Sequence, residues 1–300
     1  MKMLTKFTGG PLATGTFTLL ALIAFAGNSV LCRLALADDS IDPASFTVIR
    51  LLSGAIILAL IILVNRRPQI SGQTGSWTGA AMLFVYAVGF SYAYVSLDTG
   101  VGALILFGAV QLTMILTGLA TGNKIRHPEW AGLILAFAGF VYLIQPRLTV
   151  PESAAGVAMM TLAGIAWGCY SLKGRGSLGA INDTAYNFFR TIPFVLVLAL
   201  VTLDGAYWSQ TGLLLAVASG AVTSGIGYAL WYIALRNLSV TVAAVGQLSV
   251  PVIAAVGGVI FAGELITMRM SLAAVLVLGG IFIVVMSRYR HARMVAREGS

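Results

Sequence analysis

The chain has 300 residues, of which 59% are hydrophobic and 9% are charged, and its formal net charge is +8. Its mean hydropathy of +0.95 excludes an ordinary soluble domain, because helices of soluble proteins carry polar stripes and these stretches are apolar on every face. An outer-membrane barrel is excluded as well, since no segment alternates polar and apolar residues over about ten positions. The composition therefore indicates an all-α membrane protein.

Ten apolar stretches are each long enough to cross a bilayer, because a hydrocarbon core about 30 Å thick needs roughly 20 helical residues. The first is longer than the core of a signal peptide, so we expect it to stay as the first span. In chain order the predicted transmembrane helices are 16–37, 44–64, 75–97, 100–122, 128–145, 153–173, 184–203, 209–235, 239–262 and 267–287.

The Lys and Arg residues collect on alternate connections between these helices, and only Arg147 and Arg269 fall on the opposite side. Positive loops stay in the cytoplasm during insertion, so we expect both termini there, with the chain in a bacterial inner membrane. Segment 1–15 is then cytoplasmic, and 288–300 is a basic tail that rests on anionic lipid headgroups. The net charge reflects this topology, and no nucleic-acid partner is expected.

Two copies of a five-helix unit make up the predicted fold, at 16–145 and 153–287. An odd number of helices per copy inverts the second copy relative to the first, and inverted repeats are typical of alternating-access transporters with a site near the midplane. The residues that pair in the same order in the two copies are Arg33 with Arg175, Arg50 with Arg190, Gly139 with Gly280, Tyr92 with Tyr228, and Gln111 with Gln247.

Motifs at matching places in the two copies carry a resemblance to a known family. AFAGNSVLCR at 24–33 and AWGCYSLKGR at 166–175 open the copies, and ASFTVIRLL and AYNFFRTIP surround Arg50 and Arg190. FAGELIT at 261–267 precedes the last helix, although the first copy departs from it with Gly122 and Asn123. These segments resemble the drug/metabolite transporter superfamily, in particular its EamA-type exporters and, among them, exporters of aromatic amino acids. The resemblance implies ten helices and export.

Three amides are the candidate polar contacts to a substrate: Gln111, Gln247 and Asn28. An amide deep in a membrane requires partners in protein, water or substrate. The alternative is an interhelical hydrogen bond, worth about 0.6 kcal/mol in membrane proteins. Pro251 removes the hydrogen bond to the carbonyl of Gln247, so we expect a helix kink there, and Pro193 predicts a second one.

Aromatic residues inside the predicted helices are the second group of candidates. Each one alone is also explained by packing between helices, but together they predict a cavity that stacks on aromatic or large apolar groups. The candidates are Tyr86, Phe90, Tyr92, Trp167, Tyr170 and Tyr228.

All ten Asp and Glu residues fall in loops, tails or helix ends, which disfavours a buried carboxylate that couples transport to protons. Arg50 and Arg190 are the deep cations. We expect both to be structural or gating residues that anchor helices through carbonyls and snorkel to the interface. The alternative is that they bind a phosphorylated substrate.

These features predict an alternating-access exporter of amino acids, aromatic and other hydrophobic ones, with related metabolites or planar cations as further substrates. A nucleotide-sugar or sugar-phosphate transporter and a channel are the alternatives. An enzyme is least expected, because His127 and His291 lie in cytoplasmic segments and no thiol has a nearby His. We expect no catalytic residue, metal or cofactor, and a functional monomer in the lipid bilayer, with an oligomer left open.

Overall fold

The computed structural model describes residues 11–65, 75–120, 126–144, 151–174, 179–235, 237–238, 243 and 246–298. Predictions that concern Arg147, Arg175 and the turn at Gly122 and Asn123 lie outside these residues. Nearly all of the described chain is helical, in the order α2 (Pro11–Ala37), α3 (Pro43–Asn65), α4 (Trp77–Tyr94), α5 (Thr99–Ala120), α6 (His127–Ile144), α7 (Pro151–Lys173), α8 (Ala180–Val201), η2 (Leu203–Gly205), α9 (Gln210–Ala218), η3 (Ser219–Ile226), α10 (Gly227–Leu235), α12 (Val250–Ala262) and α13 (Met268–Glu298).

Seven helical segments of the described chain are long and apolar enough to cross a membrane, judged by length and composition. One of them, Gln210–Ala234, combines α9, η3 and α10. The other three predicted spans correspond to shorter helices, α4, α6 and α12, of 18, 18 and 13 residues, so the count of ten stays a prediction. The last predicted span, 267–287, coincides with the candidate span Met268–Ser287, and α13 continues as a helix beyond it to Glu298.

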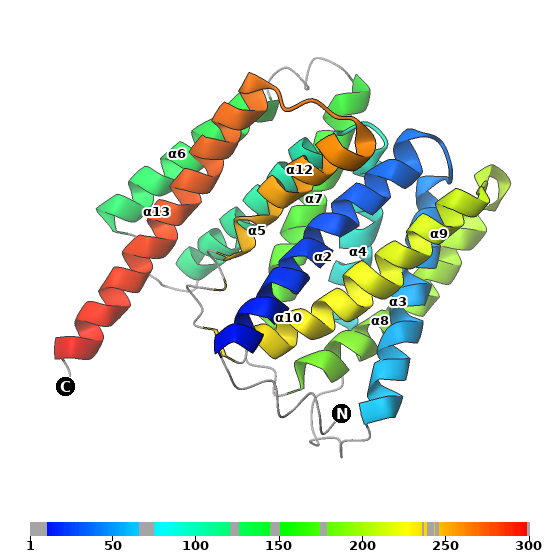
Figure 1. Cartoon of the computed structure of the whole chain (residues 1–300), viewed down its shortest axis with the longest axis horizontal. Helices are drawn as coiled ribbons and strands as arrows, with labels where there is room; N and C mark the ends of the chain where they lie inside the picture. Colours follow the sequence, from blue (N-terminus) through cyan, green and yellow to red (C-terminus); the bar gives the residue numbers. More distant parts are fainter. Residues whose placement is uncertain are drawn as a thin grey trace.

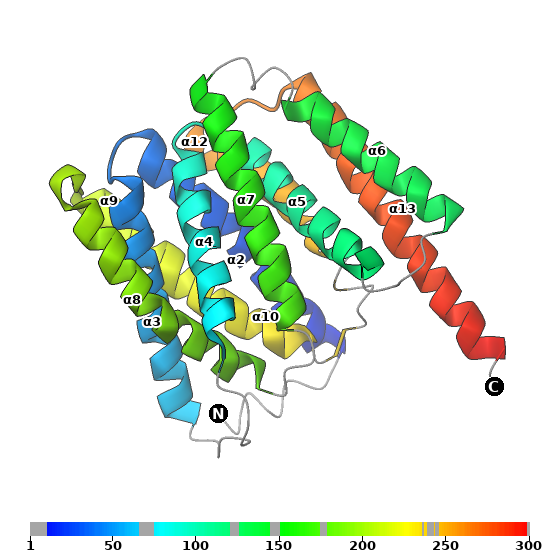
Figure 2. The same ribbon diagram turned by 180° about the vertical axis from the view of Figure 1, so that it is seen from behind.

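The helices form one bundle, and its long helices run between two ends (Figure 1). We call the end with Asp42, Asp98 and Glu264 the acidic end, and the end with Arg126 and Lys173 the basic end. α2 begins and α13 finishes at the basic end (Figure 1). α6 and α13 lie side by side along one flank of the bundle in both views (Figures 1 and 2).

Close backbone approach holds α6 against α13. A Cβ atom added at Gly139 would lie 2.6 Å from the Cβ of Leu276, and one added at Gly132 would lie 2.6 Å from the carbonyl oxygen of Gly280. Only glycine fits at such a crossing, as is usual where membrane helices pack tightly.

Most contacts between the first half (α2 to α6) and the second half (α7 to α13) come in matching pairs. α4 packs on α7, and its counterpart α10, together with η3, packs on α2. α5 packs on α7 as α12 packs on α2, and α4 packs on α8 as η3 packs on α3. Three further contacts join helices at the same place in each half, namely α3 with α8, α5 with α12, and α6 with α13. In addition, α9 packs on α2 and α3, and α5 contacts α13.

A π-helix interrupts the third helix of the second half. Ser76 and Ser209 cap α4 and α9 in the same way, each accepting from a glycine N–H three residues later. The chain from the cap to the matching tyrosine is longer in the second half (209–228) than in the first (76–92). The wider turns of η3 hold more residues per turn, which accommodates part of this surplus.

Pro251 lies in the first turn of α12, which begins at Val250, where its missing N–H has no helical partner to lose. The helix kink expected at Pro251 stays a prediction. Pro193 does lie inside α8. Much of the predicted span before Val250 lies outside the described residues, so α12 is described as a helix of 13 residues.

Candidate functional site: an aromatic cavity between the halves

A small cavity of about 20 Å³ lies between the two halves near the middle of the helices. Residues from both halves form it, and none of those described in its lining is acidic. They are Phe25, Asn28, Tyr86, Phe90, Leu106, Phe107, Trp167, Thr223, Tyr228 and Gln247. A space of this size holds roughly one water molecule, so a larger ligand requires the lining side chains to move.

Aromatic rings in mutual contact form one wall of the cavity. Trp167 lies between two tyrosines, with ring centroids 4.8 Å from Tyr86 and 5.2 Å from Tyr228. Phe25 meets Tyr228 edge to face at 5.8 Å. Such a wall is flat, apolar and adaptable, which suits an aromatic or large aliphatic ligand group.

The amide of Asn28 is held in one orientation by the π-helix. Its Oδ1 accepts from Ser219 Oγ at 2.6 Å and from Thr223 Oγ1 at 3.2 Å, so its Nδ2 is directed to the hydroxyl of Tyr86 at 3.3 Å. The Ser219 hydroxyl is the main donor to Oδ1, because the single hydrogen of Thr223 Oγ1 also has the Ser219 carbonyl oxygen as an acceptor, at 2.7 Å. The unusual turn geometry of η3 thus places polar groups at the cavity.

Arg50 lies behind this polar cluster, and its side chain is 2% exposed. Its Nη2 donates to the Tyr86 hydroxyl at 2.9 Å, and its guanidinium carbon lies 5.1 Å from the ring centre of Tyr86 and 4.7 Å from that of Phe90. Its Nη1 has no hydrogen-bond partner in the described chain. The prediction that Arg50 snorkels to the interface is therefore wrong.

The charge of Arg50 is poorly compensated by the protein. Burying an ion costs several kcal/mol, whereas a desolvated cation–π contact contributes about 2 kcal/mol. The titratable groups that interact with its charge are the phenols of Tyr86 and Tyr228 and the thiol of Cys32, none of them a carboxylate. The interior thus carries excess positive charge next to the cavity.

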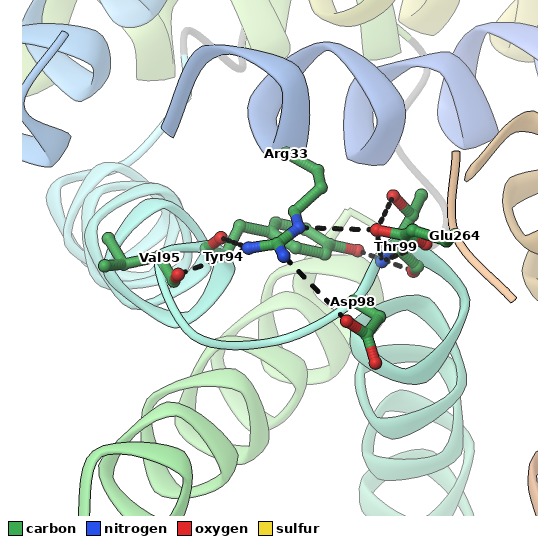
Figure 3. Close-up of polar contacts among 6 residues, drawn as sticks. All are labelled: Arg33, Tyr94, Val95, Asp98, Thr99 and Glu264. Carbon is green, nitrogen blue, oxygen red and sulfur yellow. Dashed lines mark hydrogen bonds and ion pairs between the residues drawn. The ribbon is translucent and has the colours of Figure 1, made fainter. Parts of the chain in front are cut away.

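Unlike Arg50, Arg33 at the acidic end has carboxylates and backbone carbonyl oxygens as partners (Figure 3). Its Nε donates to Glu264 Oε1 at 3.3 Å, its Nη1 donates to the carbonyl oxygens of Tyr94 and Val95 at 3.0 and 3.2 Å, and its Nη2 lies 3.8 Å from Asp98 Oδ1. This arrangement ties α2 to the connection between α4 and α5 and to the turn before α13.

Glu264 also caps α5. Its two carboxylate oxygens accept from the backbone N–H of Thr99 at 2.8 and 2.9 Å, and Oε1 accepts from Thr99 Oγ1 at 2.9 Å (Figure 3). A carboxylate at a helix N-terminus satisfies free N–H groups and interacts favourably with the helix dipole.

Two aspartates hold the halves together at opposite ends. At the acidic end Asp42 Oδ2 accepts from the backbone N–H of Tyr207 at 3.0 Å, and at the basic end Asp183 Oδ1 accepts from that of Gly75 at 3.0 Å. Each aspartate lies at the N-terminal end of the second helix of its half and binds the segment before the third helix of the other half. Gly75 has φ +66, and a Cβ there would lie 2.6 Å from Asn187 Oδ1, so this contact requires glycine.

The predicted binding residues divide between the cavity and its surroundings. Asn28, Tyr86, Phe90, Trp167, Tyr228 and Gln247 line the cavity. Gln111 is buried on α5 outside the lining, and Tyr92 is half-buried outside it. Tyr170 stacks on Trp167 at 5.4 Å and accepts from Asn187 Nδ2 at 3.3 Å, one layer behind the wall.

Sequence reasoning missed four lining residues, Phe25, Leu106, Phe107 and Thr223. Phe25 lies three residues before Asn28 and therefore on the same helix face, a signal that was available. Ser219 and Thr223 give a second signal, since two hydroxyls four residues apart share one face of an apolar helix. Arg190 is half-buried near the rings of Trp77 and Tyr186, at 6.0 and 5.9 Å.

Comparison with known proteins identifies the family. The sequence profile of the EamA-like transporter family matches this chain twice, over residues 14–145 and 154–286. The chain belongs to this family. It is a multi-pass membrane transporter, which is compatible with the expectation that it is not an enzyme.

Relatives cover nearly the whole chain. An uncharacterized protein of Pseudomonas aeruginosa is 46% identical, over 94% of this chain and 97% of that protein. A protein of Escherichia coli named "Probable amino-acid metabolite efflux pump" is 24% identical, over 93% and 97%. A solved crystal structure aligns with a TM-score of 0.64 at 20% identity, over 90% of this chain and 97% of that one, which shows a shared fold.

Proposed function

We propose that this EamA-type transporter is an alternating-access exporter of amino acids, preferring aromatic and other hydrophobic ones, in the bacterial inner membrane. The observation that carries the proposal is the cavity between the halves, where the Tyr86, Trp167 and Tyr228 rings meet a polar cluster at Asn28. The rings suit an apolar side chain, and the polar cluster suits the charged backbone groups of an amino acid.

The mechanism we propose is rocking of two inverted five-helix repeats, at 16–145 and 153–287, with ten spans and both termini in the cytoplasm. Matching cross-half contacts support it, because most of these contacts have a counterpart when the halves are exchanged. The double family match supports it as well. Inverted repeats have two related packings, one open to each side of the membrane.

Asp42 and Asp183 are the clearest pair of gating contacts in this proposal. They make equivalent bonds between the halves at opposite ends of the bundle. Opening toward the acidic end requires the Asp42 contact to break, and opening toward the basic end requires the Asp183 contact to break. The small volume of the cavity agrees with a conformation in which both contacts are made.

The names of relatives support the substrate class, since two matching proteins, of Escherichia coli and Salmonella typhimurium, are named "Probable amino-acid metabolite efflux pump". Transport of another metabolite class and a channel remain the alternatives. Resemblance to exporters of aromatic amino acids in particular stays a prediction.

Purified protein in liposomes tests the proposal. We expect saturable uptake of labelled phenylalanine, accelerated by unlabelled phenylalanine or tryptophan on the other side, because a carrier exchanges substrate through one site. Trp167→Ala is expected to weaken uptake, while Trp208→Ala, at an exposed position of the acidic end, serves as the control. Flux without saturation or counterflow indicates a channel, and no amino acid flux overturns the substrate assignment.

A further inference from the structure

We propose that Tyr86 and Arg50 form a carboxylate-recognition site in the cavity, with the Tyr86 hydroxyl as the donor that touches the ligand and Arg50 as the cation that positions and polarises it. The inference rests on the proposed function for the identity of the ligand as an amino acid. Its content is narrower, since it states which group of the ligand is recognised and by which atoms.

The hydrogen bonds of Tyr86 determine where its proton points. The phenol oxygen already accepts from Arg50 Nη2 at 2.9 Å and from Asn28 Nδ2 at 3.3 Å. A phenol has a single O–H to donate and few acceptor positions, so its hydrogen is left for a third partner. Tyr86 lines the cavity, and within the described part of the chain its hydroxyl accepts these two hydrogen bonds and donates none. The donor is therefore available to a ligand.

The charge next to this donor selects an anion. Arg50 is fully buried, its Nη1 is unpaired, and within the described ranges no carboxylate contacts it. The rings of Tyr86 and Phe90 lie against its guanidinium, and Arg50 itself is absent from the cavity lining. Its charge thus acts through the Tyr86 hydroxyl, strengthening that donor toward a negative acceptor.

The ligand class follows from what surrounds the donor. One cation and one free hydroxyl match a single negative charge, and the rings of Trp167 and Tyr228 match an aromatic or aliphatic body. None of the described lining residues is a carboxylate, so no fixed anion pairs with an ammonium group. The site thus fits a monocarboxylate with an apolar body, and the amine of an amino acid contributes less to recognition than its carboxylate.

Competition for labelled phenylalanine counterflow in proteoliposomes tests this. Unlabelled 3-phenylpropionate, which lacks the amine, is expected to compete within a few-fold of phenylalanine, whereas phenylalaninamide, which lacks the carboxylate, competes at least about tenfold more weakly. Equal competition by the amide overturns the inference while leaving the amino acid proposal intact. If phenylalanine is not carried, the amino acid proposal fails. The carboxylate site is then tested separately, by comparing the binding of 3-phenylpropionate with that of its amide, measured by tryptophan fluorescence.

Variants locate the effect. Tyr86→Phe keeps the ring and removes the hydroxyl, so the acid-to-amide preference is expected to fall to near one. Arg50→Gln is expected to do the same, with partial recovery in Arg50→Lys. Tyr232→Phe removes a phenol on α10 outside the lining and is expected to keep the preference. A Tyr86→Phe protein that still prefers the acid overturns the inference, even if the Arg50 variants fail to fold.

Discussion

Arg33 and Arg50 extend from neighbouring helices of the same half, yet the protein treats their charges in opposite ways. Arg33 meets Glu264, Asp98 and two backbone carbonyls at the acidic end. Arg50 is buried among aromatic rings, and within the described residues its side chain donates to one phenol, that of Tyr86. A cation whose partners are internal stabilises the fold, whereas a buried cation without an anion is stabilised when a ligand brings one. The difference separates a structural arginine from one available to function.

Arg50→Met gives the largest expected effect. Uptake of carboxylate substrates at low concentration should fall on the order of 100-fold, because a charge-assisted interaction is lost. The melting temperature in detergent should not fall, since replacing an uncompensated buried charge with an apolar side chain of similar volume is neutral or stabilising. Initial uptake rates and thermal unfolding measure the two effects, and a lower melting temperature with normal uptake would make Arg50 a structural residue.

Glu264→Gln should show the opposite of Arg50→Met, with lower stability and an unchanged ligand preference. The ion pair with Arg33 and part of the cap of α5 are lost, which should destabilise the protein by about 2 kcal/mol. The preference for acid over amide should not change, because Glu264 lies at the acidic end away from the cavity. In a double variant with Arg33→Gln the stability losses should be less than additive. Additive losses in thermal unfolding would show that the two side chains do not interact.

Tyr86→Phe sharpens the comparison by leaving the ring contacts of Arg50 in place. Uptake of carboxylate substrates should fall about tenfold, the cost of one hydrogen bond to a charged group. The reduction should appear in competition assays with acids and be absent with amides. A loss shared by both ligand classes would instead point to a packing role for the hydroxyl.

Asp98→Asn should have the smallest effect. Its ion pair with Arg33 spans 3.8 Å, and the Asp98 side chain is 46% exposed. Partly exposed pairs contribute about 0.2–1 kcal/mol, and salt screens them. Unfolding at low and high salt should therefore show a difference of a few tenths of a kcal/mol that shrinks as salt increases. A loss of stability as large as that of Glu264→Gln would show that Asp98 contributes as much as Glu264 to holding Arg33.

Most of the helical architecture could be predicted because its cause is local. Apolar length and bounding polar residues predicted a helix at 44–64, and the structure has Pro43–Asn65. The pairing of residues between the two copies predicted equivalent roles for Gln111 and Gln247, but their positions in the structure differ. Gln247 lines the cavity and Gln111 does not, because related sequences pack against different neighbours once side chains fill the interface between the halves.

The sequence by itself determined the membrane class, the positions of most helices and an interior rich in aromatic residues, since hydropathy and residue type act within a single helix. Tertiary structure alone decided which side chains meet. The burial of Arg50 beside Tyr86, the orientation of Asn28 by the π-helix, and the bonds of Asp42 and Asp183 across the halves join residues far apart in the chain. Such contacts depend on how helices pack, and no periodicity within one helix encodes them.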